Sequence, residues 1–94
     1  MMKRLVHPGT VLADELEDLE LSASALARAI KVPPNRITQI IKGERSITGD
    51  TALRLGHWFN MNPVFWLNLQ SNFDLNLARQ AVGDEIEALP RQSA

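Results

Sequence analysis

Apolar residues recur at helical spacing along almost the whole chain, in stretches separated by proline, glycine or helix-capping residues. No stretch shows the strict alternation of apolar and polar residues that marks a half-buried strand. The pattern predicts five helices, at about residues 8–19, 22–30, 34–43, 48–59 and 63–83. Ser22 and Thr48 are the expected N-caps of the second and fourth helices, and the first has one apolar stripe, made of Leu12, Leu16 and Leu19. Because the chain has only 94 residues, we expect one all-α domain over residues 1–83, followed by a short tail at 84–94.

Composition excludes several classes of site. The chain has no cysteine, which excludes disulfides and cysteine-based zinc sites. His7 and His57 are its only histidines and it has no Gly-rich phosphate loop, so we expect neither an enzyme nor a cofactor. No apolar run approaches the roughly 20 residues of a membrane helix, and no signal peptide is visible. We therefore expect a cytoplasmic protein without a membrane partner.

Residues 23–42 have the pattern of two short helices joined by a tight turn. Ala27 supplies a small residue where such helices cross. Val32, Ile37 and Ile40 supply the apolar side chains that fill the angle between them. This pattern matches the DNA-binding helix-turn-helix, whose second helix lies in the major groove. Other helical hairpins share the spacing, so the pattern alone leaves the function open.

The polar face of the helix at residues 34–43 carries no carboxylate. It consists of hydrogen-bonding side chains: Asn35, Arg36, Thr38, Gln39 and Lys42. Asn and Gln can bind adenine through two hydrogen bonds, Arg can bind guanine, and a Thr methyl can touch thymine. A merely solvated face would usually include Glu or Asp. We therefore interpret this face as a nucleic-acid surface, with Asn35, Arg36, Thr38 and Gln39 reading bases.

The net charge of −1 is an average over opposed segments. Residues 1–30 carry a net −2, residues 31–58 a net +3 and residues 59–94 a net −2. The positive segment includes the proposed base-reading helix, so phosphates are expected to lie there. We assign phosphate contacts to Lys42 and Arg45, and also to Ser22 and Ser24 at the start of the preceding helix.

Three blocks of sequence resemble a known family: His7-Pro8-Gly9, Val32-Pro33-Pro34-Asn35-Arg36-Ile37 and Phe65-Trp66-Leu67-Asn68-Leu69-Gln70. Over about residues 7–79 the chain resembles the HigA-type antitoxins, a branch of the phage repressor-like (Xre) helix-turn-helix group. The resemblance implies a dimeric antitoxin that neutralises a RelE-like mRNA-cleaving toxin and represses its own operon at a palindromic operator. The chain departs from the family pattern at Ala23, Ala25 and Lys31. Lys31 replaces the usual turn glycine; a left-handed residue there would cost about 1 kcal/mol, so we expect a turn that is either strained or differently shaped.

The helix at residues 63–83 is apolar around much of its circumference. Such a helix needs two partners, the core of its own domain and a second surface. We expect a two-fold homodimer whose recognition helices lie about 34 Å apart. The alternative is that one small bundle buries all of these side chains. The residues assigned to the dimer interface are Phe65, Trp66, Leu69, Phe73 and Leu77.

Two further functions remain open beside the antitoxin: a stand-alone phage-type repressor without a toxin, and an interaction module that has lost DNA binding. A toxin that cleaves mRNA needs cationic groups to hold RNA, so an acidic surface would complement it. The helix at residues 8–19 offers four carboxylates for that contact: Asp14, Glu15, Glu17 and Asp18. These carboxylates have no histidine companions, and we expect no metal site there.

Overall fold

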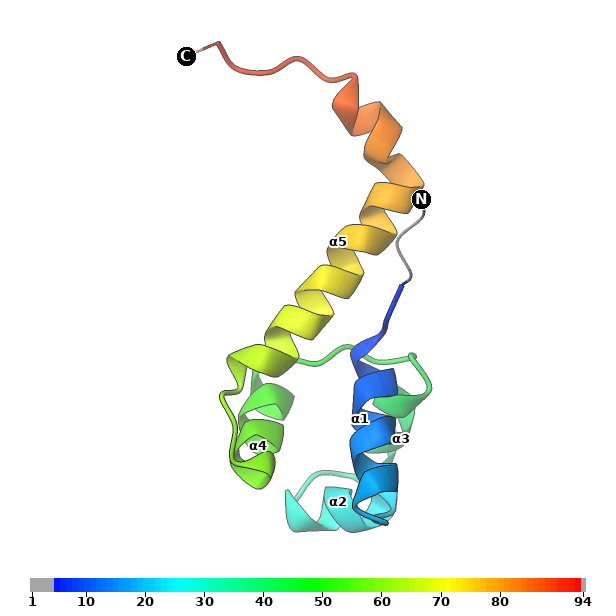
Figure 1. The fold of residues 1–94 in the computed structure, drawn as a ribbon, viewed down its shortest axis with the longest axis vertical. Coiled ribbons are helices and arrows are strands. Elements are labelled where there is room, and N and C mark those ends of the chain that lie inside the picture. Colours follow the sequence, from blue (N-terminus) through cyan, green and yellow to red (C-terminus); the bar gives the residue numbers. More distant parts are fainter. Residues whose placement is uncertain (1–4, 94) are drawn as a thin grey trace.

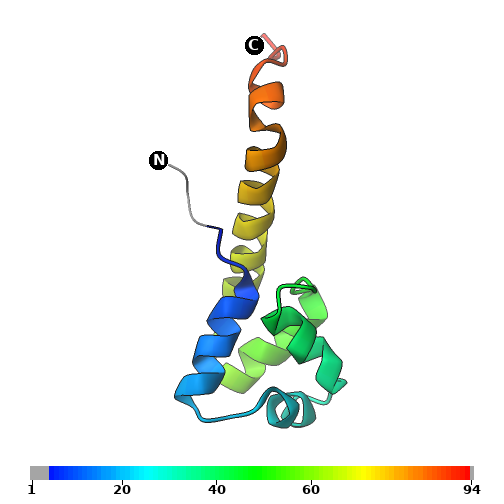
Figure 2. The same ribbon diagram turned by 90° about the vertical axis from the view of Figure 1, so that its right-hand side faces the viewer.

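The computed structural model describes residues 5–93, which form five helices and no strand. The helices, in the order drawn in Figure 1, are α1 (Pro8–Asp18), α2 (Ala23–Ala29), α3 (Pro34–Ile41), α4 (Gly49–Phe59) and α5 (Val64–Glu87). Figure 2 shows α1 to α4 gathered in a globular part, with α5 projecting from it. The molecule therefore measures 51 Å in its longest direction and only 27 and 21 Å in the others. The all-α, five-helix prediction is confirmed.

The start of α1 explains the His7-Pro8-Gly9 block. The His7 ring nitrogen Nδ1 accepts a hydrogen bond from the Gly9 N–H at 2.9 Å. Pro8 occupies the first turn, where the backbone N–H groups have no partner within the helix, so its missing N–H costs nothing. Gly9 packs directly against the end of α3, because a Cβ at this position would lie 1.8 Å from the Ile40 carbonyl oxygen. The three residues thus fix both the start of α1 and its distance from α3.

The core lies between α1, α2, α3, α4 and the first turns of α5. Six large apolar side chains in it have no exposed surface: Leu12, Leu26, Ile37, Ile40, Leu55 and Trp66. Trp66 packs beside Phe59 of α4, with ring centroids 5.8 Å apart. Full burial of such side chains stabilises a fold by about 1.5–3 kcal/mol each, which makes this cluster the main source of stability.

Gln70 joins α5 to the segment between α3 and α4. Its side chain is 6% exposed, and its Oε1 accepts the Ile47 backbone N–H at 2.8 Å. Its Nε2 donates to Asp74 Oδ1 at 3.0 Å. A buried backbone N–H needs such a partner, so this one side chain holds the entry to α4 in place.

Several predicted helix ends differ from the structure; α3, expected to reach Gly43, ends at Ile41. Leu19 was expected to be on the buried stripe of α1, but it is 55% exposed because α1 ends at Asp18. The last helix was expected to end near Gly83 but continues to Glu87, because Gly83 does not adopt the positive φ of a helix-ending glycine. Within residues 5–93 no helix has an apolar stretch suited to crossing a bilayer.

Candidate DNA-binding surface

Helices α2 and α3 form the predicted hairpin. Ala27 and Ile37 are fully buried where the two helices pack together. The turn begins at Lys31, whose φ of 58° is left-handed, and the Val32 N–H bonds back to the Ala27 carbonyl at 2.9 Å. Of the two alternatives for this turn, the structure has the strained one. Its conformation turns the chain sharply enough to place α3 across α2.

The four residues assigned to base reading lie on one helix but differ in exposure. Asn35 is exposed, whereas Arg36, Thr38 and Gln39 are half-buried. The Thr38 hydroxyl lies 3.4 Å from the Pro34 and Asn35 carbonyls, within its own helix. That weak back-bonding leaves the Thr38 methyl group as the part available for an apolar contact.

Arg36 is held by a carboxylate that sequence reasoning did not connect to it. Its guanidinium forms an ion pair with Asp50 in the first turn of α4, and Arg54 Nε donates to the same carboxylate oxygen at 2.9 Å. Arg54 also donates to the Ile30 carbonyl at the end of α2, at 2.7 Å. Hydrogen bonds from Arg54 and Arg36 lower the pKa of the Asp50 carboxyl. This network ties α2, α3 and α4 together and neutralises part of the positive charge expected on α3.

A hollow of about 230 Å³ lies beside Arg36 at the start of α4. Two arginines and three hydroxyl-bearing residues line it: Arg36, Arg45, Ser46, Thr48 and Thr51. Thr48 is the N-cap of α4 and accepts the Thr51 N–H at 3.4 Å. Cations, hydroxyl groups and a helix N-terminus are the groups that bind anionic oxygens. Sequence reasoning assigned Arg45 to phosphate but missed the hydroxyls, although the Thr48 cap marked where they lie.

The remaining phosphate candidates are on the surface. Lys42 and Arg45 are exposed and form no ion pair within the described residues. Ser22 caps α2, accepting the Ala25 N–H at 3.0 Å, and Ser24 is exposed two residues further on. The cap role predicted for Ser22 is therefore confirmed, and its hydroxyl hydrogen stays available to an acceptor.

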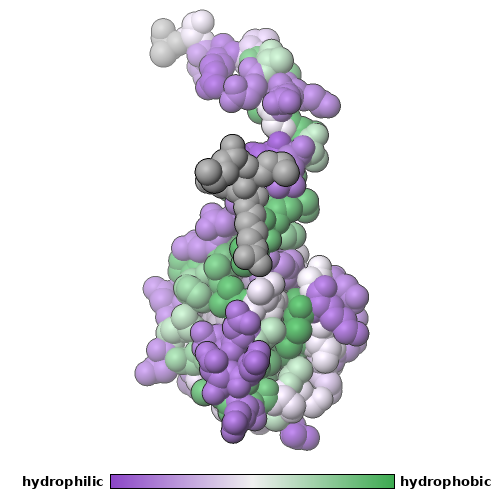
Figure 3. Space-filling view, turned by 45° about the vertical axis from the view of Figure 1, so that its right-hand side comes forward, coloured by the Kyte–Doolittle hydropathy of each residue, from purple (hydrophilic) through white to green (hydrophobic). Residues whose placement is uncertain are grey.

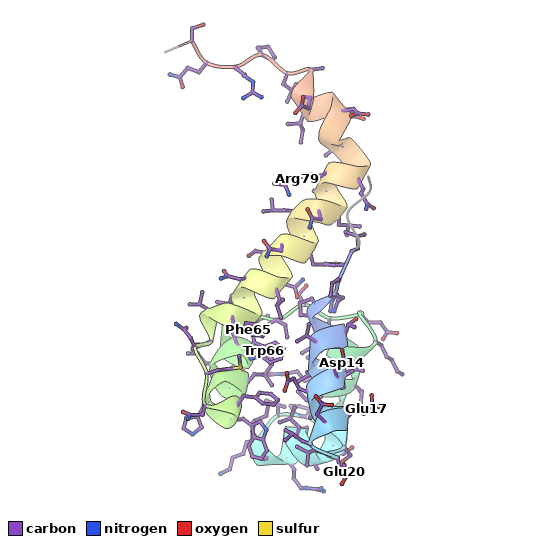
Figure 4. All side chains as sticks on the ribbon, in the orientation of Figure 1. Asp14, Glu17, Glu20, Phe65, Trp66 and Arg79 are labelled. Atoms are coloured by element: carbon purple, nitrogen blue, oxygen red, sulfur yellow. The ribbon has the colours of Figure 1, made fainter. Side chains whose placement is uncertain are left out.

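The four carboxylates proposed for toxin contact lie on α1, away from the proposed base-reading residues on α3. Asp14, Glu15, Glu17 and Asp18 are all exposed, and Figure 4 shows Asp14 and Glu17 along α1 with Glu20 beyond its end. Within residues 5–93 no group of three histidines or carboxylates is arranged to hold a metal ion. The face is thus a solvated negative surface.

The residues assigned to a dimer interface do not share one exposed face. Trp66 is fully buried in the core, where Figure 4 shows it between α5 and α1, so the assignment of Trp66 to an interface is wrong. Leu69 and Phe73 are half-buried, and Phe73 meets the His7 ring edge-on at 4.9 Å. Phe65 and Leu77 are 41% and 47% exposed. Trp66 lies on the helix face that the globular part covers, whereas the assignment of Phe65, Leu69, Phe73 and Leu77 to an interface stays a prediction.

Comparison with known proteins identifies the fold and the family. A family model described as helix-turn-helix matches residues 12–65. Virulence-associated protein I of Dichelobacter nodosus is 47% identical over 76 residues, which are 80% of this chain and 70% of that protein. A HigA-family addiction module antidote protein from Coxiella burnetii is 46% identical, with a TM-score of 0.93 over 97% of this chain and 100% of that one. The antitoxin HigA of Pseudomonas aeruginosa, solved with the higBA promoter, is 40% identical, with a TM-score of 0.91 over 97% and 100%.

These matches agree with the geometry of α2 and α3 and with the three sequence blocks. The chain belongs to the helix-turn-helix family and, within it, to the HigA-type antitoxins, which are transcription regulators rather than enzymes.

Proposed function

We propose that this protein is a cytoplasmic antitoxin that, as a homodimer, binds a palindromic operator and represses its own operon. The observation that carries the DNA-binding part is the carboxylate-free polar face of α3 beside the hydroxyl- and arginine-lined hollow. The relative from Pseudomonas aeruginosa that was solved with promoter DNA has the same fold, which supports this assignment. A two-fold dimer would present two such faces to one palindrome.

Within this proposal the residues divide into two roles. Asn35, Arg36, Thr38 and Gln39 contact base edges in the major groove. Lys42, Arg45, Ser22 and Ser24 contact phosphates, and the hollow at the start of α4 receives one phosphate beside Arg45. Arg36 reaches a base only by leaving Asp50 or by sharing its guanidinium with both groups.

A gel shift with the promoter of the protein's own operon tests DNA binding. We expect the wild type to shift the promoter and a triple alanine variant at Asn35, Arg36 and Gln39 to lose the sequence preference. Replacing Arg45 with Ala should instead weaken binding to all sequences alike and reduce the salt dependence by about one unit of slope. Absence of any wild-type shift at low salt would refute the repressor function.

We further propose that the antitoxin neutralises a RelE-like toxin through the acidic face of α1. Charge complementarity supports this, because an enzyme that cleaves mRNA presents cations and α1 presents Asp14, Glu15, Glu17 and Asp18. A variant with these four residues changed to Asn or Gln should bind the toxin encoded beside it more weakly in a pull-down or by calorimetry. The same variant should still shift the promoter. Undiminished toxin binding would exclude this surface.

The second candidate function is a stand-alone repressor without a toxin. The DNA-binding surface of α3 supports it equally, because an antitoxin and a stand-alone repressor would bind DNA through the same residues. A gene for a basic protein of about 90 residues next to this one, whose product binds the purified protein, decides for the antitoxin. Failure of that product to bind, together with a positive gel shift, decides for the stand-alone repressor.

A further inference from the structure

Helices α2 and α4 border a groove that contains none of the residues proposed to bind DNA. Its volume is about 310 Å³, at the small end of the range for ligand pockets. The apolar part of its lining comes from the end of α2 and the outer face of α4: Ala29, Ile30, Leu53 and Trp58. Leu53 is 64% and Trp58 41% exposed. Helix α4 therefore holds two large apolar side chains in solvent that the packing of the single chain does not cover.

Two cations border this apolar lining, Lys31 from the turn after α2 and Arg54 from α4. Lys31 is exposed and forms no ion pair within the described residues. His57, which also lines the groove, can donate a further hydrogen bond. Within residues 5–93 no carboxylate lines the groove. The groove thus combines an apolar floor with a cationic edge, which is complementary to an anion with an apolar body.

The Arg54 guanidinium is fixed in position and still has donors to offer. Its Nε donates to Asp50 at 2.9 Å and its Nη1 donates to the Ile30 carbonyl at 2.7 Å, so it spans from α4 to the end of α2. A guanidinium has five N–H donors, and these are its two hydrogen bonds within the described residues. An anion in the groove can therefore bind Arg54 without displacing the Ile30 carbonyl.

We propose that this groove binds a small carboxylate with an apolar body, such as an arylalkanoate, and that the bound ligand weakens operator binding. The carboxylate binds Lys31 and Arg54, and the apolar body contacts Leu53 and Trp58. The size of the lining favours a small ligand over a protein. Only seven residues line the groove, whereas a protein interface uses about 20–30 residues on each side.

One carboxylate connects the groove with a proposed base-reading residue. Asp50 forms ion pairs with both Arg54 and Arg36. A ligand carboxylate competes with Asp50 for the positive charge of Arg54, so Asp50 then holds Arg36 more strongly. Because Arg36 reaches a base only by leaving or sharing Asp50, the bound ligand lowers the affinity for the operator. This coupling rests on the proposed DNA-binding function, whereas ligand binding in the groove does not.

Titration with 4-phenylbutyrate tests ligand binding, and 4-phenylbutanol is the control with the same apolar body and no charge. Trp58 is 41% exposed and Trp66, the other tryptophan of the chain, is fully buried, so a blue shift of the emission reports Trp58. We expect a saturable shift with a dissociation constant in the millimolar range or below, as for other ligands of about a dozen atoms. The alcohol should bind at least about fivefold more weakly. Equal affinities would overturn the role of the cations, and absence of a saturable shift would overturn the ligand site.

Matched leucine substitutions show where the ligand binds. They are needed because Figure 3 shows other apolar side chains at the surface, along α5 beyond the globular part. Leu53 in the groove is 64% exposed and Leu75 on α5 is 51% exposed, so Gln at either position replaces a similarly exposed side chain. We expect Leu53→Gln to weaken 4-phenylbutyrate binding at least about fivefold and Leu75→Gln to leave it unchanged, with circular dichroism verifying that both variants fold. Equal effects of the two substitutions, or the reverse order, would overturn the site in the groove.

A promoter gel shift with and without saturating 4-phenylbutyrate tests the coupling to DNA. We expect the ligand to lower the promoter affinity of the wild type about fivefold or more. The affinity of Leu53→Gln should not change at the same ligand concentration. Unchanged wild-type affinity with the groove occupied would overturn the coupling. A protein that binds 4-phenylbutyrate through Leu53 but shifts no promoter would instead refute the repressor function and leave the ligand site standing.

Discussion

Replacing Gln70 with Ala should destabilise the protein by about 2–4 kcal/mol. Removing the side chain leaves the buried Ile47 N–H without its 2.8 Å acceptor, which costs about 1–3 kcal/mol. The lost buried methylene adds about 0.8 kcal/mol. A domain of this size has a total stability of only about 5–14 kcal/mol, so we expect the midpoint of thermal unfolding to fall by more than about 10 °C.

Urea unfolding followed by circular dichroism measures this effect. All variants should be compared at one protein concentration, because dimerisation would make the stability concentration-dependent. Gln70→Met keeps most of the packing and removes only the hydrogen bonds to Ile47 and Asp74, so it should cost about 1–3 kcal/mol. Gln80→Ala changes an exposed glutamine on the same helix and should stay within about 0.5 kcal/mol of wild type.

The Gln70 variants also connect stability with DNA binding. Ile47 precedes Thr48, the cap of α4 and part of the hollow beside Arg45. Loss of the Gln70 contact should therefore weaken promoter binding at temperatures where the variant is still folded. If Gln70→Ala and Gln70→Met were both as stable as Gln80→Ala, the hydrogen bond to Ile47 would not contribute as argued.

Three further changes test other contacts by the same unfolding assay. Gly9→Ala should lower the free energy of unfolding by about 3 kcal/mol or more, because the new Cβ would overlap the Ile40 carbonyl oxygen. Gly49→Ala is the control: its Cβ meets no atom within 4 Å, so the variant should be as stable as the wild type or slightly more stable. Lys31→Gly should raise the free energy of unfolding by about 1 kcal/mol, since glycine adopts the positive φ of this position without strain. A lower free energy of unfolding would show that Lys31 is not strained. Burial lowers the pKa of His7 below its ordinary value of 6.5, and the nearby Asp74 carboxylate opposes this shift. The folded protein therefore binds fewer protons than the unfolded chain, and its stability should decline as the pH falls below about 6.5. His7→Asn keeps a capping oxygen without titrating there and should lack that decline.

The features that sequence reasoning predicted correctly depend on neighbours in the chain. Ser22 and Thr48 cap their helices through the N–H of a residue three positions on. The tight turn between α2 and α3 follows from the small and apolar residues around it, Ala27, Val32 and Ile37, all of which are buried. Caps, turns and helical spacing act over three or four residues, so a single sequence displays them directly.

The contacts that sequence reasoning missed join residues far apart in the chain. Asp50 binds Arg36 from 14 residues away, and Gln70 binds Ile47 from 23 residues away. No local pattern connects such pairs, because each depends on how the helices pack. Trp66 was assigned to the dimer interface for a related reason. Buried and exposed apolar side chains of α5 are neighbours in the sequence, as Trp66 and Leu67 are, so only the position of the globular part shows which of them is covered.

The structure also changes the meaning of the net +3 on residues 31–58. Arg36 and Arg54 both bind Asp50, so these three charges form a structural unit that holds α2, α3 and α4 together. The cations of this segment that are exposed without an ion pair are Lys31, at the turn before α3, and Lys42 and Arg45. Phosphate neutralisation by the two assigned to phosphates, Lys42 and Arg45, gives only a modest salt dependence. Operator affinity should therefore depend strongly on neutral donors, namely the α3 amides and the hydroxyls around the hollow, which bind only when the backbone holds them in position. The Asp50 and Gln70 contacts supply that positioning, because both hold the α4 end of the segment that joins α3 to α4, at Asp50 and at Ile47.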